Sequence, residues 1–471
     1  NCKKTALDYT KPCDLEFIIV KPRPSKETKI DDLFRSRLTQ IINTQHELVR
    51  LADKIDWTHI DQQVQPFFAV EGRPAIPSRF IIGLHILKSM YQLSDEAVCE
   101  RWVENPYYQY FCGEEFFQHT FPIQSSSMTH WRKRVGESFF EQLLQESLRI
   151  AFVSKALKID QLKRIVVDTT VQPKAVTFPT DVGLMRKAIT SLVDLAKRNN
   201  IDLRQTYERV VKRAAIKSGR YRHAKQMKRA KREEKFIRTR LGRVIRDISR
   251  KIQGNDALKD IFAGDLLKAF TAQHQQRHSK EKIYSWHAPE TECIGKGKAH
   301  KPYEFGCKVS VTTNVNSAPG GHFVLHIGAL HLNPFDGHTL APILKSFTEQ
   351  TGVTPERIYV DKGYQGHDYE HKYRVFKSGQ KRGVKGTIKK ELKRRSVVEP
   401  IIGHLKSDHA LGRNFLKGID GDKINALLAG IGYNFRLLLR WLRFFCPKIW
   451  QWLSALLSKN SDCVFHAVTI A

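Results

Sequence analysis

Acidic residues are scarce in this 471-residue chain, because 48 Asp and Glu oppose 79 Lys and Arg and leave a formal net charge of +31. An excess of this size is more than solubility requires and indicates a polyanionic partner, with nucleic acid as the first candidate. Cysteine is also sparse, with 8 residues and no C-x-x-C pair. The sequence therefore indicates neither a zinc site nor a disulfide framework, and we expect buried, reduced thiols.

Long apolar runs are absent as well, since no stretch of about 20 uncharged apolar residues is available to span a bilayer. The most apolar region, 435–457, is interrupted by Arg436, Arg440, Arg443 and Lys448, which favours an amphipathic helix. The first residues lack the apolar core of a secretory signal. We therefore expect a cytoplasmic protein with no membrane partner.

Helical patterning dominates the first third of the chain. Residues 1–30 are rich in proline and lysine and are expected to be poorly ordered. Residues 31–157 carry apolar side chains three and four positions apart, which predicts an all-helical domain. Its helices are expected at 31–53, 78–91, 94–102 and 127–155, the last with a joint at Gly136.

A basic segment of this domain, Trp131 followed by Arg132, Lys133 and Arg134, is expected to be exposed. Short helices joined by tight turns allow a helix-turn-helix that reads DNA through such a segment. A plain helical bundle with a basic surface would have the same pattern, and both interpretations stay open.

Two short runs of apolar and β-branched residues each end in an aspartate. The first, 163–172, predicts a buried strand that carries Asp168, and the second, 357–361, ends in Asp361. A buried carboxylate is costly unless it is paired or bound to a metal, so the repeated pattern favours a functional role. The alternative is that each Asp only opens or caps a turn.

The most basic part of the chain lies between these two strands. From Lys212 to Lys251 there are 17 Lys and Arg against 3 Asp and Glu, a local charge of +14. Side chains of like charge in such a run repel one another unless an opposite charge neutralises them, and DNA phosphates would do so. We expect DNA binding here with steep salt dependence and little sequence preference, although a solvated helix face has the same composition. The candidate DNA contacts are Lys228, Arg229, Lys231 and Arg232.

A third carboxylate lies between cations in the stretch 395–406. Residues four apart are neighbours on a helix and residues seven apart return nearly to the same side, so Arg395, Glu399 and Lys406 can line one stripe. Two other interpretations stay open. The stripe could be a solvated salt-bridge face, or Ser396 and Glu399 could form a capping box at a helix start that Pro400 also favours.

Two aspartates on strands and one glutamate on a helix supply the hard oxygen ligands that Mg²⁺ prefers. Two such ions, roughly 3.5–4 Å apart, serve phosphodiester chemistry by activating the attacking oxygen and stabilising the leaving oxygen. Asp168, Asp361 and Glu399 are therefore the predicted metal ligands. Asp336 and Asp408 rank lower, because Asp336 is expected in an Asp-Gly turn and Asp408 lies beyond Lys406.

These motifs resemble those of the DDE transposases of bacterial insertion sequences, in particular the insertion-sequence-five type. The resemblance covers about residues 60–445 and rests on the stretches 166–170, 333–340, 360–366 and 395–406. The family's glutamate signature is Tyr, two residues, Arg, three residues, Glu, six residues, Lys. Arg395, Glu399 and Lys406 match it, whereas Leu392 stands at the Tyr position.

The resemblance implies a mixed α+β fold with an RNase H-like catalytic core, a mixed sheet flanked by helices, formed by 158–181 and 300–420. It also makes 182–299 a basic, mainly helical insertion into this core. From their own patterning, we expect 31–157 to be a helical DNA-binding domain and 421–471 a set of C-terminal helices. By the same resemblance, Asp168, Asp361 and Glu399 hold two Mg²⁺ ions, for which Mn²⁺ can substitute. Arg395 and Lys406 would position DNA near the scissile phosphate, and Lys362 is a further candidate DNA contact.

The implied activity is cleavage of phosphodiester bonds at the ends of an insertion sequence and transfer of the 3′-OH ends to target DNA. The implied partners are double-stranded DNA, as terminal inverted repeats and as target, and further copies of the chain when two ends are paired. The implied location is the bacterial cytoplasm, in association with the nucleoid. The alternatives are a nuclease of the same fold and a basic nucleic-acid-binding protein without catalysis.

Overall fold

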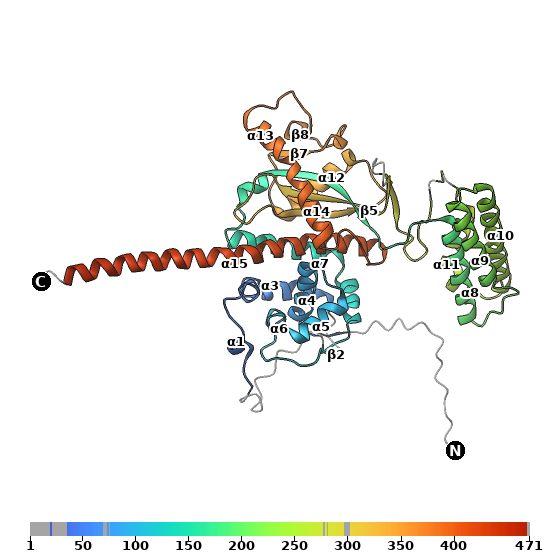
Figure 1. Cartoon of the computed structure of the whole chain (residues 1–471), viewed down its shortest axis with the longest axis horizontal. Coiled ribbons are helices and arrows are strands. Elements are labelled where there is room, and N and C mark those ends of the chain that lie inside the picture. The colour runs from blue at the N-terminus through green and yellow to red at the C-terminus, as the bar shows by residue number, and fades with distance from the viewer. Residues whose placement is uncertain are drawn as a thin grey trace, which may run out of the picture.

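A six-stranded mixed sheet flanked by helices organises this mixed α+β chain (Figure 1). The structure is a computed structural model that describes residues 19–20, 35–68, 73–74, 76–276, 278–279, 281–295 and 302–468, with side chains described as far as 443. The expected disorder of 1–30 falls almost entirely outside these residues. Ile19–Val20 (β1) and Arg73–Pro74 (β2) form a separate parallel pair.

The main sheet combines an antiparallel half with a parallel half. The order of its strands is β4-β5-β3-β7-β8. The sixth strand, β6, lies off this path and also pairs with β5. The pairs β3/β5, β4/β5 and β5/β6 are antiparallel, whereas β3/β7 and β7/β8 are parallel. The strands are β3 (Arg164–Pro173), β4 (Glu292–Gly295), β5 (Tyr303–Asn314), β6 (Val324–Leu330), β7 (Arg357–Val360) and β8 (Val375–Lys377).

The predicted strand at 163–172 is confirmed, and its β-branched residues Ile165, Val166 and Val167 are completely buried at the centre of the sheet. One detail differs, because β3 continues to Pro173 and Asp168 lies in mid-strand. The reason is that β5 pairs with β3 along nine residues, whereas β7 pairs with only the first four. Asp168 therefore follows the end of the parallel pairing and not the end of the strand.

The N-terminal helices pack on one another below the sheet in the view of Figure 1. The single helix expected at 31–53 is wrong. The chain is extended at Ile42, and a new helix begins after His46, whose ring nitrogen accepts a hydrogen bond from the Leu48 amide. The helix capped by Ser94 and the joint at Gly136 are both confirmed. The helices are α1 (Leu38–Ile41), α2 (Glu47–Ala52), α3 (Trp57–Val64), α4 (Ser78–Tyr91), α5 (Asp95–Glu104), α6 (Pro106–Phe111) and α7 (Ser126–Val153).

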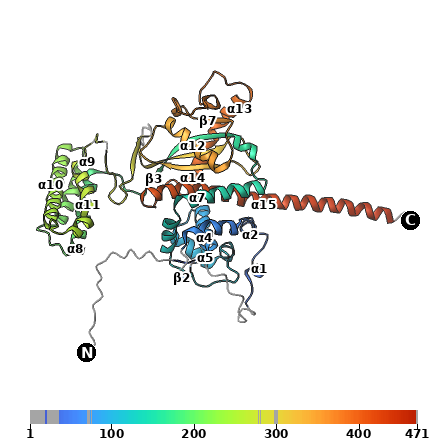
Figure 2. The ribbon, with the colours of Figure 1, turned by 180° about the vertical axis from the view of Figure 1, so that it is seen from behind.

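The basic insertion is helical, as predicted, and has a hydrophobic cluster of its own. Side chains such as Met185, Ile237 and Phe262 are buried in this cluster and not in the main core. In Figure 1 and, from behind, in Figure 2, these helices stand beside the rest of the molecule. They are α8 (Asp181–Arg198), α9 (Glu208–His223), α10 (Met227–Lys251) and α11 (Asp256–His274).

The remaining helices follow the sheet strands, and the last of them joins the two main layers. Helix α15 (Gly418–Val468) runs between the sheet and the N-terminal helices, where it packs against α4, α7 and β6. The expected docking face is confirmed for Ile431, Phe435, Leu438 and Leu442, although one continuous helix replaces the several expected. Within the described residues, no helix is both long and apolar enough to cross a membrane. The others are α12 (Asp336–Thr351), α13 (Gly386–Arg394) and α14 (Val398–Asp408).

Candidate active site

The parallel register of β3 and β7 brings the two predicted strand aspartates together. Val167 pairs with Val360, the last pair of this ladder, so the next residues are Asp168 on β3 and Asp361 directly after β7. Helix α14, which carries Glu399, packs against β3. Three carboxylates that are distant in sequence thus reach one region of the sheet.

One guanidinium group lies among these carboxylates. Atoms of the Arg395 guanidinium are 3.8 Å from Asp168 Oδ2, 3.8 Å from Asp361 Oδ1 and 3.5 Å from Glu399 Oε1. The Arg395 side chain is 13% exposed, so a cation is held in a partly desolvated position between three acids. The contact to Glu399 is the four-residue pair that the helical spacing predicts.

The carboxylates surround Arg395 and do not touch one another as a closed ligand set. In the described part of the chain, Cys307, His331 and Asp422 are the group of possible metal ligands whose donor atoms all lie within 4.8 Å of each other. Asp168, Asp361 and Glu399 do not form such a group. Their exposure rises from 19% for Asp168 to 51% for Asp361 and 64% for Glu399. The site is therefore anchored in the sheet and open on the side of α14.

Burial has changed the proton affinity of Asp168. Desolvation is the largest influence and raises the pKa of Asp168 to about 6. The Thr169 amide, which donates to Asp168 Oδ1 at 2.8 Å, and Arg395 both lower this pKa, whereas Asp361 and Asp336 raise it. Asp168 consequently exchanges its proton close to neutral pH, where a bound cation would compete with that proton.

The capping-box interpretation of Ser396 and Glu399 is wrong. Helix α14 begins at Val398 after the 3-10 turn Arg395–Val397, and its N-cap residue Val397 makes no side-chain cap. Ser396 Oγ donates to the Lys393 carbonyl instead. Because α13, the 3-10 turn and α14 follow one another directly, α14 starts from a preceding helical turn and the Glu399 carboxylate faces Arg395.

Asp336 lies much closer to this site than the sequence suggested. The expected Asp-Gly turn is wrong, because Asp336 is the first residue of α12. The Thr169 hydroxyl donates to Asp336 Oδ1 at 3.0 Å, and Lys308 Nζ lies 3.0 Å from the same oxygen. An acid in the first turn suits the helix dipole, so the Pro-Phe-Asp sequence before an apolar helix could have revealed this position. Asp408, the other rival, bonds to His404 and Ser407 on its own helix.

Glu391 is a positioning residue that the sequence analysis missed. It is 2% exposed, and it accepts hydrogen bonds from Arg357 Nε at 2.7 Å and from the Tyr359 hydroxyl at 2.5 Å. Burial alone would raise the pKa of Glu391, but these bonds lower it below its ordinary value. The contacts tie α13 to β7 and so set the position of Arg395, one residue beyond α13. The signal in the sequence was a lone acid within the cationic run 389–395.

The prediction that 131–134 is exposed is wrong for its first two residues. Trp131 is buried, and Arg132 is 4% exposed with a bidentate ion pair to Asp95, at 2.9 Å and 2.6 Å. A guanidinium inside a helical domain needs such a partner, because an unpaired buried charge is strongly destabilising. Arg132 is therefore held away from any surface phosphate, whereas Lys133 is exposed and Arg134 is half-buried.

The other candidate cations are accessible to different degrees. Lys362 is exposed next to Asp361, and Lys406 is half-buried on α14, seven residues after Glu399. The insertion cations all lie at the exposed start of α10, far along the chain from the acids. These are Lys228, Arg229, Lys231 and Arg232.

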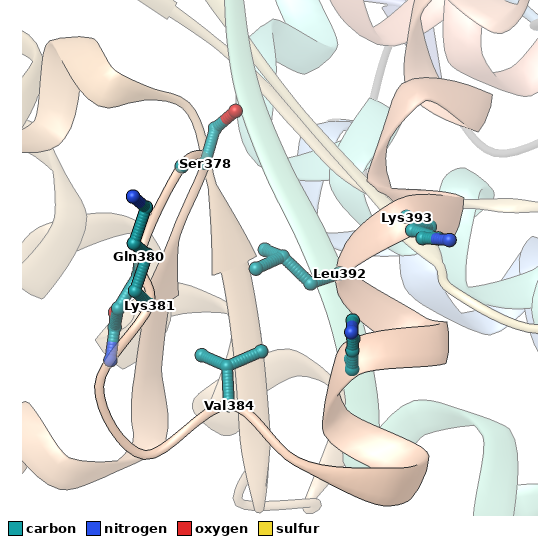
Figure 3. A pocket seen from close by; sticks show the side chains of 8 residues that line it. Ser378, Gln380, Lys381, Val384, Leu392 and Lys393 are labelled. Atoms are coloured by element: carbon teal, nitrogen blue, oxygen red, sulfur yellow. The ribbon is translucent and has the colours of Figure 1, made fainter.

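Two cavities of about 410 Å³ each adjoin this region. The first lies between α13 and the loop after β8, and its wall includes Lys381, Lys389 and Lys393. Figure 3 shows Leu392 pointing from α13 toward that loop. The second cavity is lined by Thr169, Lys308 and Asp336, among others, and therefore lies beside Asp168.

Comparison with known proteins gives two matches. Residues 36–134, which run from before α1 into α7, match the family model described as a transposase domain (DUF772). The chain is also 51% identical over 205 residues to the uncharacterized protein ORF8 in the nfe locus of Rhizobium meliloti, an alignment that covers 43% of this chain and 99% of that protein. No solved structure matches significantly.

Proposed function

We propose that this chain, whose residues 36–134 match a transposase-domain model, is a DNA transposase that cleaves phosphodiester bonds at the ends of an insertion sequence and transfers the 3′-OH ends to target DNA. The observation that carries the proposal is the convergence of Asp168, Asp361 and Glu399 on one side of a mixed sheet, around Arg395.

The architecture supports the finer assignment to the DDE, insertion-sequence-five type with an RNase H-like core. One acid lies on β3, the second directly follows the parallel neighbour β7, and the third lies on a helix that packs against β3. This is the mixed sheet flanked by helices that the motif resemblance implies. The rigid elements hold the acids in fixed positions, as a catalytic constellation requires.

The donor atoms of this site fit Mg²⁺. All three candidate ligands are carboxylates, the class of oxygen ligand that Mg²⁺ prefers, and two of them are at least half exposed. Asp168, Asp361 and Glu399 would hold two ions, for which Mn²⁺ can substitute. When bound, Mg²⁺ stabilises charge on the phosphodiester oxygens and lowers the pKa of the attacking water or hydroxyl.

Arg395 has two roles in this proposal. Its single positive charge offsets part of the negative charge of the three acids, and it would give up these contacts if a metal bound there. Its planar guanidinium would then be available to donate two parallel hydrogen bonds to the phosphate. Lys406 and Lys362 would add further positive charge. In phosphoryl transfer, such positioning and charge stabilisation supply most of the rate.

The basic insertion would contribute affinity for double-stranded DNA at the element ends and at the target. Its exposed cations on α10 contact phosphates without reading bases, so sequence recognition must come from other residues. In this proposal, more than one copy of the chain pairs the two DNA ends, and the protein acts on DNA in the bacterial nucleoid.

The test is to compare the wild-type protein with Asp168→Ala on a plasmid that carries the element ends, in Mg²⁺. We expect the variant to bind the ends normally but to lose cleavage and strand transfer. The matched control is Asp408→Asn, an acid on α14 that faces its own helix, which should remain active. Full cleavage by Asp168→Ala would overturn the proposal, and nicking of any duplex by the wild type without joining would show a nuclease instead.

A further inference from the structure

A second cluster of metal-ligating side chains lies where β5, β6 and α15 meet. Cys307 is in β5, His331 directly follows β6, and Asp422 is near the start of α15. One donor atom of each residue lies within 4.8 Å of the other two. We propose that these residues bind a divalent cation of the zinc type, at a site separate from the three catalytic carboxylates.

The imidazole of His331 is oriented as a ligand would be. Its Nε2 is buried without a hydrogen-bond partner and lies 3.8 Å from Asp422 Oδ2, while its Nδ1 lies 3.5 Å from Glu292 Oε1. A carboxylate behind the ring is the usual arrangement of a metal-bound histidine, because it fixes the tautomer and presents the other nitrogen to the ion. A buried nitrogen without a partner is costly, and a cation in the cluster would satisfy it.

The local charge also favours a cation. Lys174 Nζ lies 2.8 Å from Asp422 Oδ1 and 2.7 Å from Glu290 Oε1, and Glu292 adds a third carboxylate nearby. One lysine therefore opposes three acids in a largely buried region. Lys174 and the Asn414 amide both use Oδ1 of Asp422, which leaves Oδ2 directed toward His331.

The chemistry of the donor set selects the class of ion. Sulfur, imidazole nitrogen and carboxylate oxygen together suit Zn²⁺ and not Mg²⁺, and three protein ligands leave a fourth position for water. The Gln172 side-chain amide donates a hydrogen bond to the Cys307 sulfur at 3.5 Å. A bound cation would hold this sulfur as the thiolate.

The position of the cluster indicates a structural role. Cys307 is opposite Gln172 on β3, which is four residues and therefore about 13 Å along the strand from Asp168. Glu290, which precedes β4 at the end of the insertion, also accepts a hydrogen bond from the Gly418 amide at the start of α15. A cation here would fasten the sheet, the base of the insertion and α15 together, and its binding energy would add to folding stability.

The experiment uses the full chain, loaded with Zn²⁺ or Co²⁺ and dialysed. We expect one tightly held zinc per chain, a thiolate-to-cobalt absorption band and a raised unfolding temperature. Cys307→Ser should abolish the band, and Glu292→Gln should weaken binding by roughly 10- to 100-fold. The matched control is Cys293→Ser, a thiol on β4 outside the cluster, which should change none of these.

The wild-type spectrum decides the proposal even if a variant fails to fold. Absence of both the cobalt band and the retained zinc from the wild type would overturn it, as would an unchanged band in Cys307→Ser. The Asp168→Ala variant should keep its zinc, so failure of the catalytic proposal and failure of the zinc proposal are distinguishable outcomes.

Discussion

Replacing Asp168 with Asn should make the folded protein more stable in the absence of divalent cations. Asp168 is 19% exposed, and its pKa in the folded state is about 6 against an ordinary value of 3.8. Because the folded state binds this proton more tightly, ionisation of Asp168 disfavours folding. The penalty is absent below pH 3.8, grows as the pH rises toward 6 and is complete above it.

The size of the effect follows from the same values. Each pH unit corresponds to about 1.36 kcal/mol, so the difference between 3.8 and about 6 sets an upper bound of roughly 3 kcal/mol. Asn keeps an oxygen for the Thr169 amide, and Arg395 keeps two other acids. After allowance for partial solvent screening, we expect a gain of about 1–2 kcal/mol at pH 7.5 and almost none at pH 4.

Urea unfolding in EDTA at several pH values is the appropriate assay, with Asp361→Asn as the matched control because Asp361 is half exposed. Added Mg²⁺ should stabilise the wild type and leave Asp168→Asn unchanged. Two results would refute the reasoning that a buried carboxylate, only partly compensated by Arg395, controls the stability of this site. One is a variant less stable than the wild type at pH 7.5, and the other is a variant that Mg²⁺ stabilises as much as it stabilises the wild type.

Other substitutions test the remaining interactions. Glu391→Ala leaves Arg357 without its partner and should cost about 3–5 kcal/mol in urea unfolding, a destabilisation that shrinks as the pH falls below 4.5. Arg395→Lys keeps the charge but not the bidentate fork, so end cleavage should slow by at least tenfold with DNA affinity unchanged; full activity would contradict the phosphate role. Arg132→Leu should destabilise the protein by removing the bidentate partner of Asp95, which keeps its ion pair with Lys88, without altering the salt dependence of DNA binding. Alanine at four cations should reduce the slope of log affinity against log salt by about 0.9 for each phosphate that is no longer neutralised, and an unchanged slope would exclude their binding to DNA. These four are Lys228, Arg229, Lys231 and Arg232.

The sequence determined the features that depend on neighbours along the chain. The run around Val166 predicted a central strand, because β-branched apolar residues without polar alternation suit a strand buried on both faces. Ser94 predicted a helix start, and the four-residue spacing of Arg395 and Glu399 predicted their contact. Each of these requires only the local geometry of a strand or a helix.

Tertiary structure decided which side chains meet across elements and which cations face solvent. Arg132 has the composition of a DNA contact, yet Asp95 on another helix holds it inside the domain. Cys307, His331 and Asp422 are separated by 24 and 91 residues, so no short spacing could indicate a metal site. Their proximity comes from the pairing of β5 with β6 and the packing of α15, because long-range contacts are set by how whole elements pack and not by the residues beside each ligand.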